Sequence, residues 1–178
     1  VKGNYIFSPS KSGLMVIHAR RAIEQIVYTS TINSFISSPI ASQKLLFPLE
    51  KEVSKKECLN WNNNTTILKQ LGFDGVIEND TLSISTVPSV LEEETLSTTI
   101  EDILDTIGHK DIEKGDLAHS LVAAIARSAG MKRLNLTTNE AVESLINQLF
   151  QCENHMFTAT NKKIIDTIDI ESIDVKFK

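Results

Sequence analysis

Apolar and polar residues alternate at both ends of the chain, which is the pattern of half-buried strands. Residues 4–18, NYIFSPSKSGLMVIH, predict a hairpin whose turn lies in SPSKSG. Residues 162–177 carry isoleucines at near-alternating positions and predict a strand that runs into a short turn or helix. Because both segments have the alternation of pairing partners, we expect them to form one sheet despite their separation in sequence.

The middle of the chain mostly follows the helical period instead. Pro39 disfavours helix at the residue before it and ends the first helical stretch. Thr137 or Thr138, with Glu140 close behind, forms the capping signature of the last long helix. The expected helices cover residues 19–37, 50–71, 95–108, 116–132 and 136–150, and a second hairpin is expected over residues 75–88 with its turn at ENDT.

Strands and helices are therefore mixed without a regular β-α-β rhythm, which favours an α+β fold over a parallel sheet. A mainly antiparallel sheet built from both chain ends implies a discontinuous lobe with the middle of the chain inserted into it. We expect residues 1–40 and 134–178 to form the first lobe and residues 41–133 to form the second.

Composition narrows the classes of protein that fit. The chain has 178 residues, of which 41% are apolar, so a disordered chain is excluded. The net charge of -5 argues against a surface dedicated to nucleic-acid binding. The apolar runs are far shorter than a membrane span. Two cysteines fit a reducing cytoplasm. A strand-like start without an initiator Met suggests a fragment of a longer protein.

The order of the segments is similar to that of a known family. GNYIFSPSKSGLMVIHARRAIEQIVY resembles the opening of the C-terminal domain of the MutL family of DNA mismatch repair proteins. The resemblance covers essentially the whole chain and continues in the same order through QKLLFP, LKQLGFD, SISTVPSVL, LTTNEAVESLINQLF and CENHMFTATNKKI.

The resemblance implies a homodimer whose dimerisation lobe is the one built from both chain ends, and a regulatory lobe inserted into it. The dimer would hold two ATPase halves together around DNA, and ATP and Mg²⁺ would belong to an N-terminal half absent from this chain, which itself has no cofactor. It also implies a cytoplasmic, nucleoid-associated protein that meets other mismatch repair proteins. The first hairpin, the last strand and the Val142–Leu149 face are candidates for the dimer surface; the alternative is that they form an ordinary monomer core.

Many members of this family also nick DNA with bound metal ions, through a helix that reads D-Q-H-A-x-x-E-x-x-x-x-E. Carboxylates and imidazoles are needed there because they hold the metals that activate water. At the matching positions this chain has His18, Arg20, Glu24 and Thr29, so only Glu24 is kept. An arginine at a ligand position places a cation where a metal cation should bind.

The other nuclease elements are equally altered. The family sequence C-P-H-G-R-P corresponds to CENHMF, which keeps Cys152 but has Asn154 in place of the histidine and His155 one position late. At the third metal-binding element of the family, this chain has Ala126 at a ligand position, and alanine has no ligating atom. His119 lies about two helical turns earlier.

We therefore expect no catalytic activity and no metal in this chain. The alternative is a metal-dependent DNA-nicking endonuclease with a displaced ligand set of His18, Glu24, Cys152 and His155. Without a metal, His18 would end a strand at a polar edge, Glu24 would be a solvated helix residue, and Cys152 would be a small buried thiol.

The hexapeptide QKLLFP is a candidate partner-binding segment for the replication sliding clamp, as the resemblance implies. Gln43 offers a donor and an acceptor to a polar sub-pocket, and Pro48 limits the unbound conformations. Leu45, Leu46 and Phe47 supply apolar surface for a pocket. The alternative is an edge strand whose Leu45 and Phe47 face the core, and the two interpretations are compatible because an edge strand can dock by main-chain pairing.

Contact with DNA is expected to be weak at most. Arg20, Arg21, Lys132 and Arg133 could touch backbone phosphates, but on an acidic domain such binding would be sensitive to salt. A third possibility, independent of the family, is a generic α+β scaffold that binds some other protein.

Overall fold

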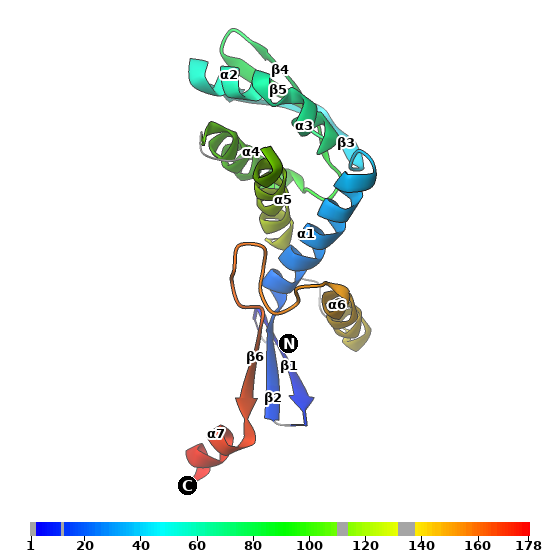
Figure 1. Ribbon diagram of the computed structural model, residues 1–178, viewed down its shortest axis with the longest axis vertical. Helices are drawn as coiled ribbons and strands as arrows, with labels where there is room; N and C mark the ends of the chain where they lie inside the picture. Colours follow the sequence, from blue (N-terminus) through cyan, green and yellow to red (C-terminus); the bar gives the residue numbers. More distant parts are fainter. Residues whose placement is uncertain (1–2, 12, 110–113, 132–137) are drawn as a thin grey trace. The chain divides into compact units, whose positions relative to one another are not determined.

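The first sheet joins the two ends of the chain in a computed structural model that describes residues 3–11, 13–109, 114–131 and 138–178. Strands β1 (Tyr5–Ser10) and β2 (Gly13–His18) form an antiparallel hairpin, and β6 (Ile165–Asp169) pairs antiparallel with β2 on its other side. The order β1-β2-β6 confirms the predicted sheet (Figure 1). Gly13 has φ +150°, and a Cβ atom there would lie 2.1 Å from the carbonyl oxygen of Ile168, so only glycine permits this approach of β6.

Two long helices belong with this sheet. Helix α1 (Ala19–Ser37) follows β2 directly, as predicted, and α6 (Asn139–Gln151) begins at Thr138, whose side chain accepts a hydrogen bond from the backbone N–H of Ala141. The terminal strand runs into α7 (Ile170–Asp174) and a 3₁₀ turn, η1 (Val175–Phe177), as the sequence predicts. The buried core of this part comprises Ile6, Ile17, Ala19, Ala22, Leu145, Leu149, Ile164 and Ile165.

A second three-stranded sheet has the order β3-β5-β4, with β3 (Ser42–Glu52), β4 (Asp74–Glu78) and β5 (Thr81–Pro88) all antiparallel to their neighbours. The β4–β5 turn places Asn79 at φ 50° and Asp80 at φ 59°. Two successive positive φ values suit the tight turns whose twist matches that of the strands, and asparagine and aspartate tolerate them. The second predicted hairpin is therefore confirmed.

The prediction of one helix over residues 50–71 is wrong. Residues 50–52 complete β3 in register with β5, and the helical part divides into α2 (Lys55–Asn63) and α3 (Thr65–Gln70). Ser54 starts α2 through a capping box with Glu57, in which each side chain hydrogen-bonds to the backbone N–H of the other. Cross-strand pairing with β5 prevails here over the helix propensity of the charged residues.

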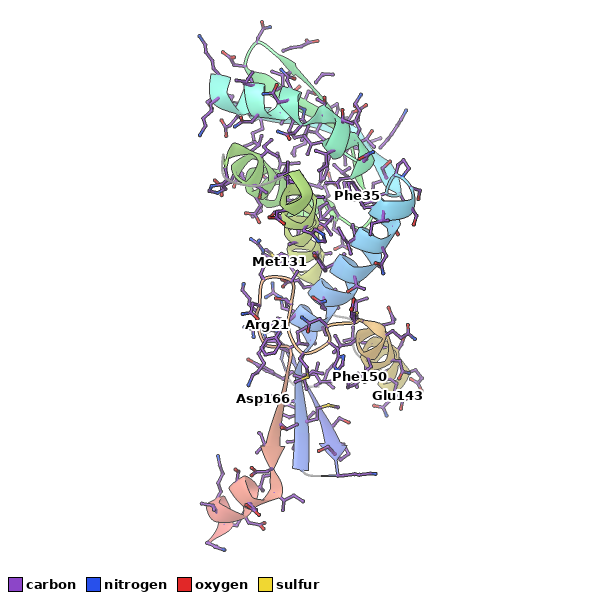
Figure 2. The ribbon with its side chains drawn as sticks, in the orientation of Figure 1. Arg21, Phe35, Met131, Glu143, Phe150 and Asp166 are labelled. Atoms are coloured by element: carbon purple, nitrogen blue, oxygen red, sulfur yellow. The ribbon has the colours of Figure 1, made fainter. Side chains whose placement is uncertain are left out.

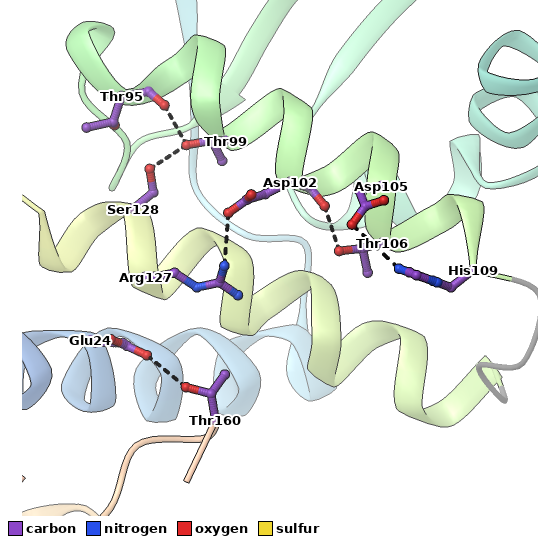
Figure 3. A network of polar contacts seen from close by, with 10 residues as sticks. All are labelled: Glu24, Thr95, Thr99, Asp102, Asp105, Thr106, His109, Arg127, Ser128 and Thr160. Atoms are coloured by element: carbon purple, nitrogen blue, oxygen red, sulfur yellow. Dashed lines mark hydrogen bonds and ion pairs between the residues drawn. The ribbon is translucent and has the colours of Figure 1, made fainter. Parts of the chain in front are cut away.

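Two more helices, α4 (Glu93–Gly108) and α5 (Lys114–Gly130), complete the described elements. A buried polar contact joins them, between the hydroxyl groups of Thr99 and Ser128 (Figure 3). Arg127 also donates to the Asp102 carboxylate over 3.2 Å. The surrounding core includes Trp61, Leu68, Phe73, Leu82, Ile84, Ile100, Ile103, Leu121, Val122 and Ile125.

The chain divides into two compact units: Val1–Thr29 with Gly130–Lys178, and Ser30–Ala129. Each unit contains one antiparallel sheet with helices, so the predicted α+β class is confirmed. The roles of dimerisation lobe and regulatory lobe, with the boundaries at residues 40 and 133, stay predictions, because compactness alone assigns no role. Among the described helices, none has the length and apolar character needed to cross a membrane.

Candidate interaction site

One face of the sheet in the first unit packs against the core, and the other face is partly exposed. Ile6, Ile17 and Ile165 are neighbours across the three strands and are at most 4% exposed, so their face is the core face. The residues of opposite parity point the other way, and many of them are apolar too. We call this second surface the outer sheet face; it comprises Tyr5, Phe7, Leu14, Val16 and Ile168, of which Tyr5, Phe7 and Ile168 are 45%, 48% and 40% exposed.

A hollow of about 250 Å³ lies in the outer sheet face, at the end where β2 runs into α1. Tyr5, Val16 and Ile168 contribute apolar lining. His18, Arg21 and Lys163 contribute basic groups, and Asp166 also lines the hollow and forms an ion pair of 3.3 Å with Lys163. Figure 2 places the labelled Arg21 near this end of the sheet and Asp166 along β6. The hollow therefore combines an apolar surface with cationic groups.

His18 is held in place from both sides of its ring. The edge of the Tyr5 ring meets the His18 ring with 5.1 Å between centroids, and Nδ1 of His18 accepts a hydrogen bond of 3.5 Å from the backbone N–H of Arg21. Burial, and then the charge of Arg21, hold the pKa of His18 below its usual range. A neutral imidazole at neutral pH suits a surface that is mostly apolar.

The positions that correspond to the nuclease residues are each bound to other groups. Nε of Arg20 donates to the Gly130 carbonyl oxygen over 3.3 Å, and Glu24 accepts a hydrogen bond of 3.5 Å from the Thr160 hydroxyl (Figure 3). Glu24 is only 8% exposed, so the expectation of a solvated helix residue is wrong. Its burial follows from its packing beside Gly130, where an added Cβ would lie 3.2 Å from the Glu24 Cβ.

The remaining two positions lie near the end of α6. Cys152 is a buried thiol that donates to the Gln148 carbonyl oxygen over 3.5 Å, and the His155 ring lies 5.1 Å from the ring of Phe150. Within residues 3–11, 13–109, 114–131 and 138–178, no three His, Cys, Asp or Glu side chains form a group that could hold a metal ion. The displaced ligand set proposed from the sequence is therefore not assembled.

The two arginines on α1 each donate a hydrogen bond to a backbone carbonyl oxygen. Nη1 of Arg21 donates to the Lys163 carbonyl oxygen over 2.7 Å, in addition to the bond from Arg20 to Gly130. Lys132 and Arg133, the other candidates for phosphate contact, lie outside the described residues. Of the four candidates for phosphate contact, the two described ones therefore already have carbonyl partners.

The QKLLFP segment lies on β3, one of the two edge strands of the second sheet. The register with β5 shifts between Lys44 and Leu49, so residues 45–48 stand against the single residue Ser85. Leu46 is 89% exposed and Phe47 is 78% exposed, whereas Leu45 is half-buried. Phe47 therefore does not face the core, which contradicts that part of the edge-strand alternative.

Gln43 and the start of α4 bound the same segment. The side-chain amide of Gln43 donates to the Leu91 carbonyl oxygen over 2.9 Å. A hollow of about 430 Å³ lies between residues 43–49 and the α4 residues Glu93 and Leu96. A partner that hydrogen-bonds to the Gln43 side chain must replace its hydrogen bond to the Leu91 carbonyl oxygen. The side chains of Leu46 and Phe47 are already exposed.

Sequence reasoning missed a larger cavity, of about 550 Å³, in the second unit. The end of α1 contributes Ile32, Phe35 and Ile36, and Ile36 is 79% exposed. Apolar periodicity marked Phe35 and Ile36 only as core positions. The rest of the lining comes from α2, α3 and α5, and no local pattern in the sequence brings these segments together.

The similarity to known proteins covers most of the chain. A profile of the family described as “MutL C terminal dimerisation domain” matches residues 1–136. Three similar curated proteins are each named DNA mismatch repair protein MutL: one from Christiangramia forsetii (26% identity, 99% of this chain, 29% of the relative), one from Flavobacterium psychrophilum (27%, 97% and 28%) and one from Flavobacterium johnsoniae (30%, 97% and 27%). The chain thus spans less than a third of the length of these relatives.

Proposed function

The chain belongs to the family of MutL C-terminal dimerisation domains, and from this membership we propose that two copies dimerise through the outer sheet face. The exposed apolar side chains of Tyr5, Phe7 and Ile168 carry this proposal. Contiguous apolar surface of this kind is typical of protein–protein contacts, and a homodimer with twofold symmetry is the commonest arrangement. Leu145 and Leu149 of α6 are core residues of one chain, so the Val142–Leu149 face is not part of the proposed dimer surface.

The experiment is a measurement of molar mass by light scattering over a range of concentrations. We expect the mass of two chains at high concentration and dissociation on dilution. A strict monomer at the highest soluble concentration would contradict the proposal and favour the generic scaffold.

In the full-length protein, the dimer would couple two ATPase halves. Tethering raises the effective concentration of the attached domains, so they can meet around DNA without strong affinity of their own. The curated relatives are more than three times as long as this chain, which leaves room for such halves. If coupling needs only tethering, an unrelated dimeric coiled coil in place of this domain should restore the cooperative ATPase activity of a dimer-deficient full-length protein.

We also propose that residues 43–48 dock on the replication sliding clamp. The exposure of Leu46 and Phe47 supports this, because both can enter an apolar pocket without any rearrangement of the fold. A clamp pull-down should retain the wild-type domain and lose Leu46→Ala/Phe47→Ala. Leu59, which is 61% exposed on α2, supplies the matched control Leu59→Ala. Equal retention of all three proteins would exclude this docking segment.

The proposed role of the Gln43 side chain is tested separately. Gln43→Ala alone should weaken clamp retention less than the double variant, because the bond to Leu91 must be exchanged on binding. Stronger retention of Gln43→Ala than of wild type would contradict recognition of the glutamine.

We infer that the domain has no nicking activity of its own. The ring or carboxylate of each candidate ligand points to a separate partner, and Arg20 introduces a cation on the same helix as Glu24. Incubation of supercoiled plasmid with the domain and Mn²⁺ should leave the plasmid intact, and calorimetric titration with Zn²⁺ should show no stoichiometric binding. Nicking abolished by Glu24→Gln would overturn this inference.

A further inference from the structure

The terminal segment 170–177, made of α7 and η1, leaves the first sheet as an exposed apolar extension of β6. None of its residues is buried, and Ile170, Val175 and Phe177 are 53%, 70% and 87% exposed. Its start is fixed to the strand by a cap, in which the Asp169 carboxylate accepts a hydrogen bond of 2.7 Å from the backbone N–H of Ser172. A capped helical turn with three large apolar side chains in water needs a covering surface.

This segment continues the outer sheet face. Ile168 belongs to that face, and α7 begins two residues later at Ile170, so the exposed apolar side chains of the segment follow directly on those of β6 in the chain. Asp169 lies opposite Gly13, whereas Arg21 and Lys163 of the hollow lie at the other end of the strands, beside Tyr5 and His18, from which the hollow extends as far as Ile168. Figure 1 shows α7 beyond the end of β6 that points away from α1.

The charges at the two ends of the sheet are complementary. The terminal segment, with its cap Asp169, carries the three carboxylates of Asp169, Glu171 and Asp174, and Lys176 and Lys178 reduce its excess to one negative charge. The hollow carries one net positive charge, because Lys163 forms an ion pair of 3.3 Å with Asp166 and His18 is neutral at neutral pH, which leaves Arg21.

Two orientations of a symmetric face-to-face dimer are possible. A twofold axis along the strands would place like ends together, so carboxylates would face carboxylates and the basic groups of the two hollows would meet. A twofold axis across the strands would place each terminal segment at the hollow of the other copy. Opposite charges then meet at both ends, which disfavours the first orientation.

We propose that the terminal segment of each copy clasps the second copy and inserts Val175 or Phe177 into the hollow beside Tyr5. The clasp rests on the proposed dimer through the outer sheet face and specifies its orientation. The reach is sufficient, because packed sheets lie about 10 Å apart and eight residues of α-helix and 3₁₀ turn cover about 13 Å. By symmetry the contact occurs twice.

Chemical crosslinking between two distinguishable copies tests the clasp. One copy carries an affinity tag and Phe177→Cys, the other carries Tyr5→Cys, and Cys58→Ser removes the more accessible native thiol from both. After the copies are mixed and the dimer is verified by light scattering, a short bis-maleimide should link tagged to untagged chains. Within one chain the two ends of the strands are roughly 17 Å apart, at about 3.3 Å per residue, too far for the reagent.

A cysteine on the core side supplies the matched control. Glu143 is exposed on α6, whose Leu145 and Leu149 pack against the core face of the sheet, so Glu143→Cys should give no product with Tyr5→Cys (Figure 2). Val175→Cys with Lys163→Cys provides a second pair in case the first disturbs the contact. Phe177→Asp should weaken dimerisation about tenfold and leave the melting temperature of the diluted monomer unchanged.

The outcomes separate the clasp from the dimer itself. A dimer that gives no crosslink with either pair, or one that links Phe177→Cys to Phe177→Cys, would overturn the clasp and leave the dimer standing. A wild-type chain that stays monomeric would overturn the proposed dimer, and the clasp with it.

Discussion

Phe7 offers the sharpest test of the outer sheet face, and the expected effect of Phe7→Ala can be worked out from its exposure. A phenylalanine side chain presents roughly 200 Å² of surface, and Phe7 is 48% exposed, which leaves about 100 Å² to cover in each copy. A symmetric dimer covers it twice, so at about 25 cal/mol per Å² the upper limit is about 5 kcal/mol. If half of this area is covered, Phe7→Ala loses about 2.5 kcal/mol, or roughly 60-fold in the dissociation constant.

Sedimentation equilibrium of wild type and Phe7→Ala over a wide concentration range measures this change. Leu59→Ala, which removes a side chain that is 61% exposed in the other unit, should leave the dissociation constant within about twofold of wild type. Thermal unfolding of dilute samples separates lost association from lost folding. The reasoning is refuted if Phe7→Ala dimerises as tightly as wild type while both unfold at the same temperature.

Three other predictions concern the stability of the fold. Leu149→Ala should lower the free energy of unfolding by about 2–5 kcal/mol in urea titrations, because Leu149 is fully buried in the first core. Ser54→Ala should cost about 1 kcal/mol in the same assay because α2 loses its cap. The hydrogen bonds from Ser54 also lower the pKa of Glu57, so the stability that Glu57 contributes is present above its unfolded pKa and is lost as the pH falls through its folded pKa. Ser54→Ala should therefore reduce the dependence of the free energy of unfolding on pH in this acidic range. Thr99→Val should cost about 1–3 kcal/mol because Ser128 loses its buried partner, and the double variant Thr99→Val/Ser128→Ala should cost less than the sum of the single changes.

The sequence predicted the elements of the first unit well because their signals are local. Alternation identified β1, β2 and β6, and the capping signature gave Thr137 or Thr138 as the start of α6, of which the structure has Thr138. Alternation alone did not reveal which face of the sheet is the core face, because Tyr5 and Phe7 are as apolar as Ile6. The pairing of Ile6, Ile17 and Ile165 across three strands decides the matter, and that pairing is a tertiary property.

The error at the start of α2 has a different origin. Glu50, Lys51 and Glu52 are reasonable helix formers, but β5 offers them a complete row of backbone partners. The sequence did contain the correct start, since Ser54 and Glu57 have the spacing of a capping box. The capping box therefore marks the helix start more reliably than the charge pattern does.

The polar contacts at the positions that the resemblance matches to nuclease residues were not predictable from one sequence. The burial of Glu24 depends on the close approach of Gly130 and on the hydroxyl of Thr160, which are more than a hundred residues away. The resemblance supplied the matching positions, and it could not supply the groups that now surround them. Side-chain identity at a single position therefore says little about burial when its neighbours come from distant segments.

The exposure of QKLLFP follows from the register of its own sheet. Three consecutive apolar residues, Leu45, Leu46 and Phe47, cannot all face one side of a strand, because successive side chains alternate. Between Lys44 and Leu49 the neighbouring strand offers only Ser85, so the extra residues leave the ladder and Leu46 and Phe47 extend into solvent. The chain is therefore already extended at the segment proposed to dock on the clamp, so if it docks there, the ordering cost is lower and a change that removes the bulge should weaken binding.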